Sequence, residues 1–219
     1  MKKRRVAIYG AGGFGREVAW LAESYARPKG GFEVVAFIDD EFRKPGETIN
    51  GFPVVRVKDL SSRYPDTGVA IAIGNPKARQ AVAERCLALG LAFVELIHEG
   101  AETSRWVEIG EGAVICGGNI ITTNIIFGTQ VQINLDCTIG HDVIMDDYTT
   151  LAPGVHVSGC VHMGKRVYVG TGAVFVNGTQ DSPLVIGDDA VIGAGACVTK
   201  SVPSGETWVG IPARPLVRP

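Results

Sequence analysis

The chain has 219 residues, 46% hydrophobic and 20% charged, which is the composition of a globular protein with one or two domains. Its formal net charge of −2 gives no electrostatic reason to expect binding to nucleic acid or to a membrane, and no apolar run approaches the roughly 20 residues of a membrane span. The five cysteines include no C-x-x-C pair, so their spacing suggests neither a zinc site nor a disulfide framework, and we expect a cytoplasmic protein.

The first 96 residues read as alternating strands and helices. Glycines interrupt the apolar run after MKKRR, which favours a first strand over a signal peptide. Apolar runs bounded by turn residues predict strands, and apolar spacing at i, i+3 and i+4 predicts helices. The elements expected in chain order are a strand at 4–10, a helix at 16–25, strands at 32–40 and 68–75, and a helix at 76–90. This order predicts a small parallel sheet with helices on its faces.

From residue 97 the chain follows a six-residue period, which matches neither the 3.6-residue period of an α-helix nor the two-residue period of a strand. The period continues to residue 180 and resumes at 186, after the insertion DSPLV. In sixteen of the seventeen hexads the first residue is bulky and apolar, Thr103 being the exception. Hexapeptide repeats are the signature of a parallel β-helix, in which three hexads form one coil and first-position side chains form an internal column.

These hexads, written [LIV]-[GAED]-x-x-[STAV]-x, resemble the repeats of the left-handed β-helix acyltransferases. The whole arrangement resembles the NeuD/PglD-type bacterial sugar acetyltransferases, through IYGAGGFGREV, FIDD, AIGN, IGHD, VIGAGACVTKSV and VGIPAR. The resemblance implies that residues 1–96 form a nucleotide-sugar-binding βαβ domain, half of a Rossmann-like fold. Residues 97–219 would form a left-handed β-helix acetyltransferase domain with a C-terminal tail.

The hexad IGHDVI supplies the candidate catalytic residues. With Ile139 and Val143 pointing inward, His141 and Asp142 fall at a corner of the prism, where an imidazole can accept a proton and a carboxylate can orient it. The resemblance assigns His141 as the general base and Asp142 as its partner. No cysteine is expected beside a histidine as a nucleophile, and Cys137 is expected to be buried at an inward fifth position.

The resemblance also implies acetyl-CoA as co-substrate, with no metal, and a homotrimer whose active sites lie between subunits. The backbone N–H of Gly159 would stabilise the oxyanion. The residues expected along the coenzyme A groove are Gly159, Thr171, Ala194, Lys200 and Arg214. For Lys200 and Arg214 the alternative is ordinary surface charge.

The loop GAGGFG, residues 10–15, matches G-x-G-x-x-G between a strand and a helix, which is also the dinucleotide fingerprint. With fewer than 100 residues in the domain, we favour a nucleotide-sugar whose diphosphate lies at the helix N-terminus. The substrate contacts expected are Gly13 and Phe14 for the diphosphate, Asp39, Asp40, Gly74 and Asn75 for base and ribose, and Asn134 for the sugar. The alternative for Asn134 is a turn-stabilising amide.

Two positions depart from the pattern of similar proteins, because Thr150 and Phe14 stand where those often have histidines. The remaining histidines, at 98, 156 and 162, are expected to be solvated turn residues.

The favoured function is N-acetylation of a UDP- or GDP-linked 4-amino-deoxy sugar, and the alternative is O-acetylation of the sialic acid type. A noncatalytic nucleotide-binding scaffold would not need the His141–Asp142 pair. An NAD-dependent oxidoreductase would account for the glycine loop alone.

Overall fold

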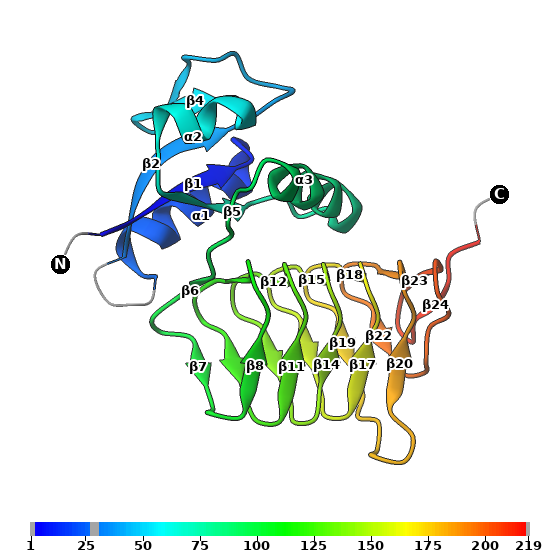
Figure 1. Ribbon diagram of the computed structural model, residues 1–219. Coiled ribbons are helices and arrows are strands. Elements are labelled where there is room, and N and C mark those ends of the chain that lie inside the picture. The colour runs from blue at the N-terminus through cyan, green and yellow to red at the C-terminus, as the bar shows by residue number, and fades with distance from the viewer. Residues whose placement is uncertain (1–2, 27–30, 218–219) are drawn as a thin grey trace. The chain divides into compact units, whose positions relative to one another are not determined.

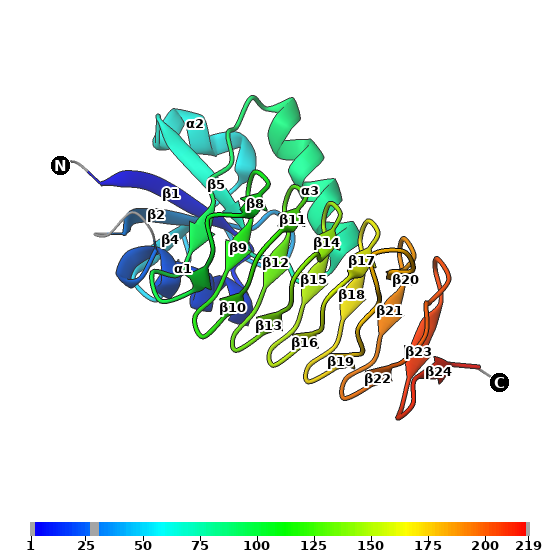
Figure 2. The same cartoon turned by 90° about the horizontal axis from the view of Figure 1, so that it is seen from below.

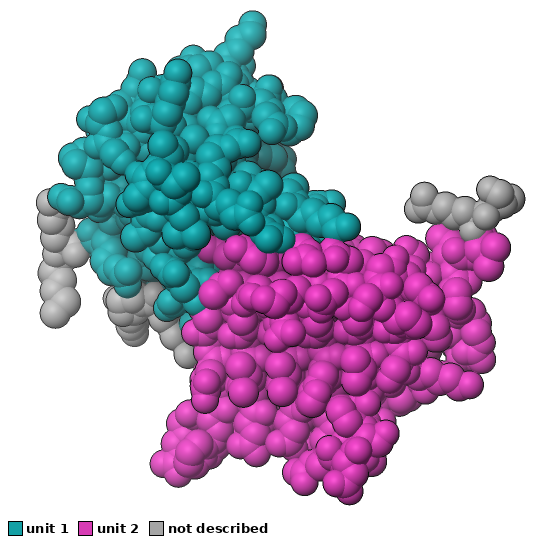
Figure 3. Space-filling model, turned by 45° about the vertical axis from the view of Figure 1, so that its right-hand side comes forward, with its two compact units in different colours: residues 1–99, 111–114 teal, residues 100–110, 115–219 magenta. Residues whose placement is uncertain are grey.

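The computed structural model describes residues 3–26 and 31–217, which divide into two compact units (Figure 1). Unit 1 comprises residues 1–99 and 111–114, and unit 2 comprises residues 100–110 and 115–219 (Figure 3). The domain boundary that we propose from the start of the repeat, after residue 96, lies inside unit 1, because residues 97–99 cluster with that unit.

Unit 1 contains a five-stranded sheet in the order β3-β4-β2-β1-β5, in which only β3 is antiparallel to its neighbour. Successive residues of β1, such as Val6, Ala7 and Ile8, are fully buried, as expected of a parallel strand covered on both faces. The five strands of this sheet are β1 (Arg4–Tyr9), β2 (Phe32–Ile38), β3 (Thr48–Ile49), β4 (Phe52–Val55) and β5 (Thr67–Ile71), whereas β6 (Leu96–Ile97) belongs to a sheet of the β-helix. The helices are α1 (Gly13–Ser24), η1 (Val57–Asp59), α2 (Leu60–Arg63) and α3 (Pro76–Ala88).

The start of each of the two longer helices is set by local sequence, by glycines at α1 and by an asparagine cap followed by proline at α3. Helix α1 starts three residues earlier than expected, directly after Gly12, and a side chain at Gly15 would stand 1.8 Å from the carbonyl oxygen of Gly10. Helix α3 begins with a proline at its first position, and the Asn75 side chain accepts a hydrogen bond from Ala78 N–H at 3.0 Å. In the described ranges, no helix has the length and apolar content needed to cross a membrane.

Unit 2 is the left-handed parallel β-helix predicted from the hexads, built from three sheets of short strands (Figure 2). Sheet 1 holds β7 (Glu102–Thr103), β10 (Ile120–Ile121), β13 (Thr138–Ile139), β16 (His156–Val157), β19 (Val174–Phe175) and β22 (Cys197–Val198). Sheet 2 holds β8 (Val107–Ile109), β11 (Ile125–Phe127), β14 (Ile144–Met145), β17 (Val161–Met163) and β20 (Leu184–Ile186). Sheet 3 holds β6, β9 (Val114–Ile115), β12 (Gln132–Ile133), β15 (Thr150–Leu151), β18 (Tyr168–Val169), β21 (Val191–Ile192), β23 (Thr207–Val209) and β24 (Arg214–Pro215).

A regular coil contains 18 residues, so up to the insertion each strand pairs with the strand 18 residues further on. Ile121 pairs with Ile139, and Ile139 pairs with Val157, all three at first hexad positions and all buried. The insertion lengthens one coil, because Val161 pairs with Leu184. The inward columns fix the register of the stack, and they leave the turns between sheets to carry polar side chains.

Candidate active site

The turns that lead from sheet 1 to sheet 2 form one corner of the prism, which we call the His141 corner. Residues at equivalent positions of successive coils stack along it: Thr123, His141, Gly159, Asn177 and Lys200 at the third hexad position, and Asn124, Asp142 and Cys160 at the fourth. The burial of Ile139 and Val143 confirms the predicted inward positions on either side of the turn and directs the side chains between them outward. Gly140 is required there, because a β-carbon would stand 2.8 Å from the nitrogen of Gly159.

His141 and Asp142 form the central contact of this corner. Nδ1 of His141 lies 2.7 Å from Oδ2 of Asp142, and the side chains are 56% and 31% exposed. Because a carboxylate only accepts, Nδ1–H donates this bond and Nε2 of the neutral imidazole keeps its lone pair. The hydrogen bond from His141, together with one from the Asn124 amide at 3.3 Å, lowers the pKa of Asp142 below its ordinary value. The pair is therefore an accessible proton acceptor with a fixed tautomer.

Gly159 lies against the imidazole, one coil further along the corner. A β-carbon at Gly159 would stand 2.6 Å from both Cε1 and Nε2 of His141. The backbone N–H of Gly159, our candidate oxyanion donor, donates to Oδ1 of Asn177 at 3.3 Å. This bond is long and its acceptor is an exposed side chain, so Asn177 can turn away when a stronger acceptor arrives.

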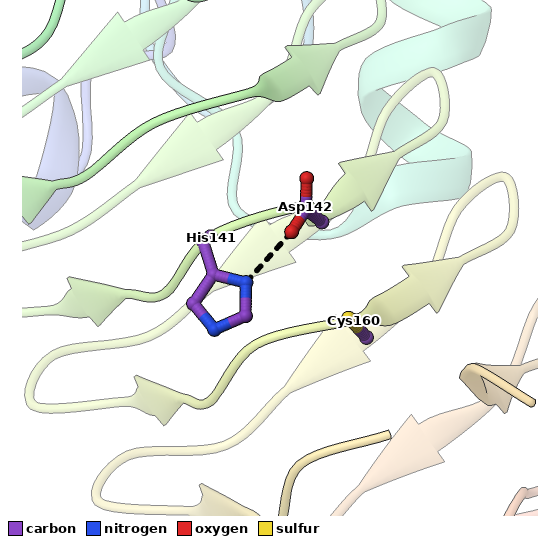
Figure 4. Close-up of side chains that lie close together, drawn as sticks. All are labelled: His141, Asp142 and Cys160. Carbon is purple, nitrogen blue, oxygen red and sulfur yellow. Dashed lines mark hydrogen bonds and ion pairs between the residues drawn. The ribbon is translucent and has the colours of Figure 1, made fainter. Parts of the chain in front are cut away.

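Cys160 lies beside His141, a proximity that we did not predict from the sequence, although no role as a nucleophile follows from it. One ligand atom each of His141, Asp142 and Cys160 lies within 4.8 Å of the other two (Figure 4). Cys160 occupies the position of Asp142 in the next coil, and its backbone N–H donates to the carbonyl of His141 at 2.9 Å. Cys137 is fully buried as predicted, and burial raises the pKa of its thiol to about 11.

The candidate coenzyme A residues occupy different places on unit 2. Gly159 and Lys200 belong to the His141 corner, and Lys200 is exposed. Thr171 and Ala194 are exposed in the turns from sheet 3 to sheet 1, which we call the Thr171 corner, and Gly195 N–H donates to the Thr171 carbonyl at 2.8 Å. Arg214 is exposed on β24. Sheet 1 therefore separates the two corners within one subunit.

A cavity of about 470 Å³ in unit 1 lies beside the glycine loop. Gly10, Ala11 and Gly12 line one side, and nothing stands within 4 Å of the place a Gly12 side chain would take. Asp39 and Asp40 also line it, with Ile73, Val82 and the exposed Phe42. The cavity offers a glycine-rich backbone, carboxylates and apolar walls to a ligand.

The two carboxylates of this cavity already make contacts inside unit 1. Asp39 Oδ1 accepts three backbone N–H bonds, from Glu41, Phe42 and Arg43. Asp40 accepts from the Tyr9 hydroxyl, from Val57 N–H at 3.0 Å and from Arg85 at 3.2 Å. Burial would raise the pKa of Asp40, but these three donors outweigh it and hold that pKa below its ordinary value.

The other expected substrate residues lie elsewhere. Gly13 and Phe14 start helix α1 and are not among the residues lining the cavity, nor are Gly74 and Asn75. Asn75 caps α3, and the carbonyl of Gly74 accepts from Arg79 at 3.3 Å. Asn134 lies at the Thr171 corner, where its amide donates to Leu151 O at 3.0 Å, the contact of a turn-stabilising amide.

The other positions singled out in the sequence lie outside the His141 corner. Thr150, which stands where similar proteins often have a histidine, is buried on β15. The remaining histidines are not the turn residues we expected, because His156 lies on β16, His162 on β17 and His98 in a β-bridge with Ala26. Nδ1 of His156 lies 2.9 Å from the Thr138 hydroxyl, and the His98 ring stacks on Tyr25 with centroids 4.9 Å apart. Sequence reasoning missed Tyr9, Arg85, Asn177 and Cys160, each of which takes its place through contacts with residues distant in the chain.

Comparison with known proteins shows relatives that span nearly the whole chain. A family model described as the PglD N-terminal domain matches residues 5–86. The GDP-perosamine N-acetyltransferase of Escherichia coli O157:H7 is 36% identical over 213 residues, which are 96% of this chain and 96% of that protein.

Two solved structures are similar over the same length. WeeI from Acinetobacter baumannii AYE has a TM-score of 0.88 and 40% identity, with 96% of this chain and 99% of that chain covered. A histidine-to-asparagine mutant of perosamine N-acetyltransferase from Caulobacter crescentus, in complex with CoA and GDP-perosamine, has a TM-score of 0.87 and 27% identity, with 97% of each chain covered.

Proposed function

Because the chain belongs to the NeuD/PglD-type bacterial sugar acetyltransferases, we propose that it acetylates the 4-amino group of a GDP-linked deoxy sugar. It is an acetyltransferase, and acetyl-CoA is its co-substrate. The choice of a GDP-linked amino sugar is supported by the E. coli and C. crescentus relatives, both of which are named for perosamine. A UDP-linked sugar is the alternative that the assay below distinguishes.

The observation that carries the proposed mechanism is the 2.7 Å hydrogen bond between His141 and Asp142. The nitrogen of the sugar amine attacks the acetyl carbonyl while Nε2 of His141 accepts a proton from that amine. The C–S bond of the tetrahedral intermediate then breaks, and the imidazolium returns the proton to the coenzyme A thiolate. The products are the acetamido sugar and free coenzyme A. Asp142 holds the tautomer and stabilises the imidazolium formed between the two steps.

We assign the oxyanion to the N–H of Gly159. Gly159 itself lies against the imidazole, so a thioester that reacts beside Nε2 would lie close to this residue. The Asn177 side chain, which now accepts from this N–H, would be displaced by the developing negative charge. A covalent acetyl-cysteine is not needed, because the amine attacks the thioester directly.

Coenzyme A would use residues of both prism corners. Thr171 and Ala194 at the Thr171 corner line one wall, and Gly159 at the His141 corner lies beside the reacting thioester. Lys200 and Arg214 are the cations we assign to its phosphates. Because sheet 1 separates the two corners in one chain, a second subunit that brings its Thr171 corner to this His141 corner would complete the groove. This separation supports the proposed homotrimer.

We place the nucleotide of the acceptor sugar in the cavity of unit 1. The open space at Gly12 lets the diphosphate approach the N-terminus of α1, with Gly13 and Phe14 in its first turn. The base and ribose would lie along the apolar wall, next to Asp39 and Asp40. Gly74, Asn75 and Asn134 remain proposed contacts, although their described hydrogen bonds stabilise local structure.

The test is acetylation of synthetic GDP- and UDP-linked 4-amino-4-deoxy sugars, with products identified by mass spectrometry. We expect one acetyl group on the GDP-linked amine and no reaction with the matching 4-hydroxy sugar. Acetylation of the UDP-linked sugar alone would reject the nucleotide assignment, and acetylation of the 4-hydroxy sugar would reject the reaction type.

A further inference from the structure

A third reactive side chain completes the His141 corner. Cys160 brings its sulfur to the pair formed by His141 and Asp142, with one ligand atom of each residue within 4.8 Å of the others (Figure 4). In residues 3–26 and 31–217, no other group of three or more His, Cys, Asp or Glu side chains meets in this way. The imidazole of the group is open to solvent, whereas Cys160 is only 6% exposed.

Backbone geometry gives no reason for a cysteine at this position. Cys160 has a φ of 54°, in the left-handed region that asparagine, aspartate and glycine adopt more readily. Asn124 and Asp142, at the equivalent positions of the two preceding coils, have φ values of 54° and 57°. The transfer reaction uses the imidazole and the carboxylate but assigns nothing to the thiol. The thiol is therefore placed against the catalytic pair without a backbone or catalytic need for it.

We propose that His141, Asp142 and Cys160 form an inhibitory site for a thiophilic divalent cation of the Zn²⁺ class. Imidazole nitrogen, carboxylate oxygen and thiolate sulfur are all Zn²⁺ ligands, and water would fill a fourth position on the solvent side. Ligands on one tetrahedral Zn²⁺ lie about 3.4 to 3.6 Å apart, given bonds of about 2.0 to 2.3 Å. Coordination would require side-chain rotations that bring the three atoms, now within 4.8 Å of one another, to that distance.

Coordination would block catalysis through the same groups that perform it. The Cys160 thiol releases its proton to solvent when its sulfur binds the cation. The bound cation would coordinate the imidazole of His141 and the carboxylate of Asp142 and would break the hydrogen bond between them. The imidazole would then no longer accept a proton from the amine. Cation binding does not depend on the proposed function, whereas inhibition of acetyl transfer does.

The binding test uses Cd²⁺, a thiophilic analogue of Zn²⁺, with the reduced full-length protein and without coenzyme A, whose own thiol would bind metal. Thiolate coordination produces an ultraviolet charge-transfer absorption. We expect this band to saturate at one Cd²⁺ per chain, to disappear in Cys160→Ser and to remain in Cys197→Ser. Cys197 is the control because it is a partly exposed cysteine of the same unit, on β22 and outside the His141 corner. A band that survives in Cys160→Ser, or no band in the wild type, would overturn the site.

The inhibition test measures acetylated sugar in quenched samples, with each variant compared with its own metal-free rate. We expect Zn²⁺ to inhibit the wild type and Cys197→Ser alike, Mg²⁺ to have no effect, and Cys160→Ser to need at least about tenfold more Zn²⁺. Equal sensitivity of Cys160→Ser and the wild type would reject the inhibitory site. If the wild type transfers no acetyl group but shows the Cd²⁺ band, the proposed function fails and the metal site stands.

Discussion

The imidazole of His141 rests on the backbone of Gly159, so closely that a β-carbon on Gly159 would stand 2.6 Å from Cε1 and Nε2. The two residues are 18 positions apart and occupy the same point of successive coils. Glycine is needed there for the position of the imidazole rather than for the turn itself, because Gly159 is not among the residues with positive φ.

Gly159→Ala is expected to displace the imidazole while leaving the backbone N–H in place. The added methyl group forces the His141 ring to rotate, which lowers kcat by at least about tenfold with little change in melting temperature. The control is a double-mutant cycle with His141→Asn, where the alanine should cost far less because no imidazole remains to be moved. Additive losses would show that Gly159 acts independently of His141.

Asp142→Asn is expected to reduce kcat less than loss of the imidazole does, because Asp142 orients and stabilises the ring but does not accept the substrate proton. The asparagine keeps the side-chain size and tolerates the φ of 57°. Steady-state kinetics with saturating acetyl-CoA measures the effect. A loss greater than that of His141→Asn would point to direct proton transfer by Asp142.

Gly12→Leu is expected to raise the KM for the nucleotide-sugar by at least about tenfold, because the side chain enters the cavity where a diphosphate would approach α1. The fold should tolerate the change, since a β-carbon at Gly12 meets nothing within 4 Å and φ there is −84°. The KM for acetyl-CoA serves as the internal control and should not change. An unchanged KM for the nucleotide-sugar would reject this cavity as its binding place.

Asp40 is expected to stabilise unit 1 in a pH-dependent way. The pKa of Asp40 is lower in the folded protein than its ordinary value of 3.8. The carboxylate therefore adds to the free energy of unfolding above pH 3.8, and this contribution is lost as the pH falls through the folded-state pKa. Asp40→Asn should therefore be less stable than the wild type at pH 7, by about 1 to 3 kcal/mol, and the difference should shrink at acid pH. Urea unfolding at both pH values measures it, with the exposed Asp181→Asn as control. A difference that stays constant would contradict this role.

The hexad period predicted the fold of unit 2 and the His141 corner, because bulky first positions can be buried in only one register. Asp142 could be placed beside His141 because the two are adjacent in the chain. The approach of Cys160 was missed, although three hexads per coil put it one coil away, because the repeat does not determine which way a fourth-position side chain turns. The contact of Tyr9 with Asp40 and Arg85 depends on tertiary packing, since Tyr9 and Arg85 lie 76 residues apart.

The central claim is that His141 accepts the amine proton during acetyl transfer from acetyl-CoA. The most direct measurement is kcat of His141→Asn with a GDP-linked 4-amino sugar, together with the Kd of acetyl-CoA for the same variant. We predict a loss of at least about 100-fold in kcat with nearly unchanged acetyl-CoA affinity, because the side chain removed acts on the proton rather than on the coenzyme. Turnover close to that of the wild type would contradict the account.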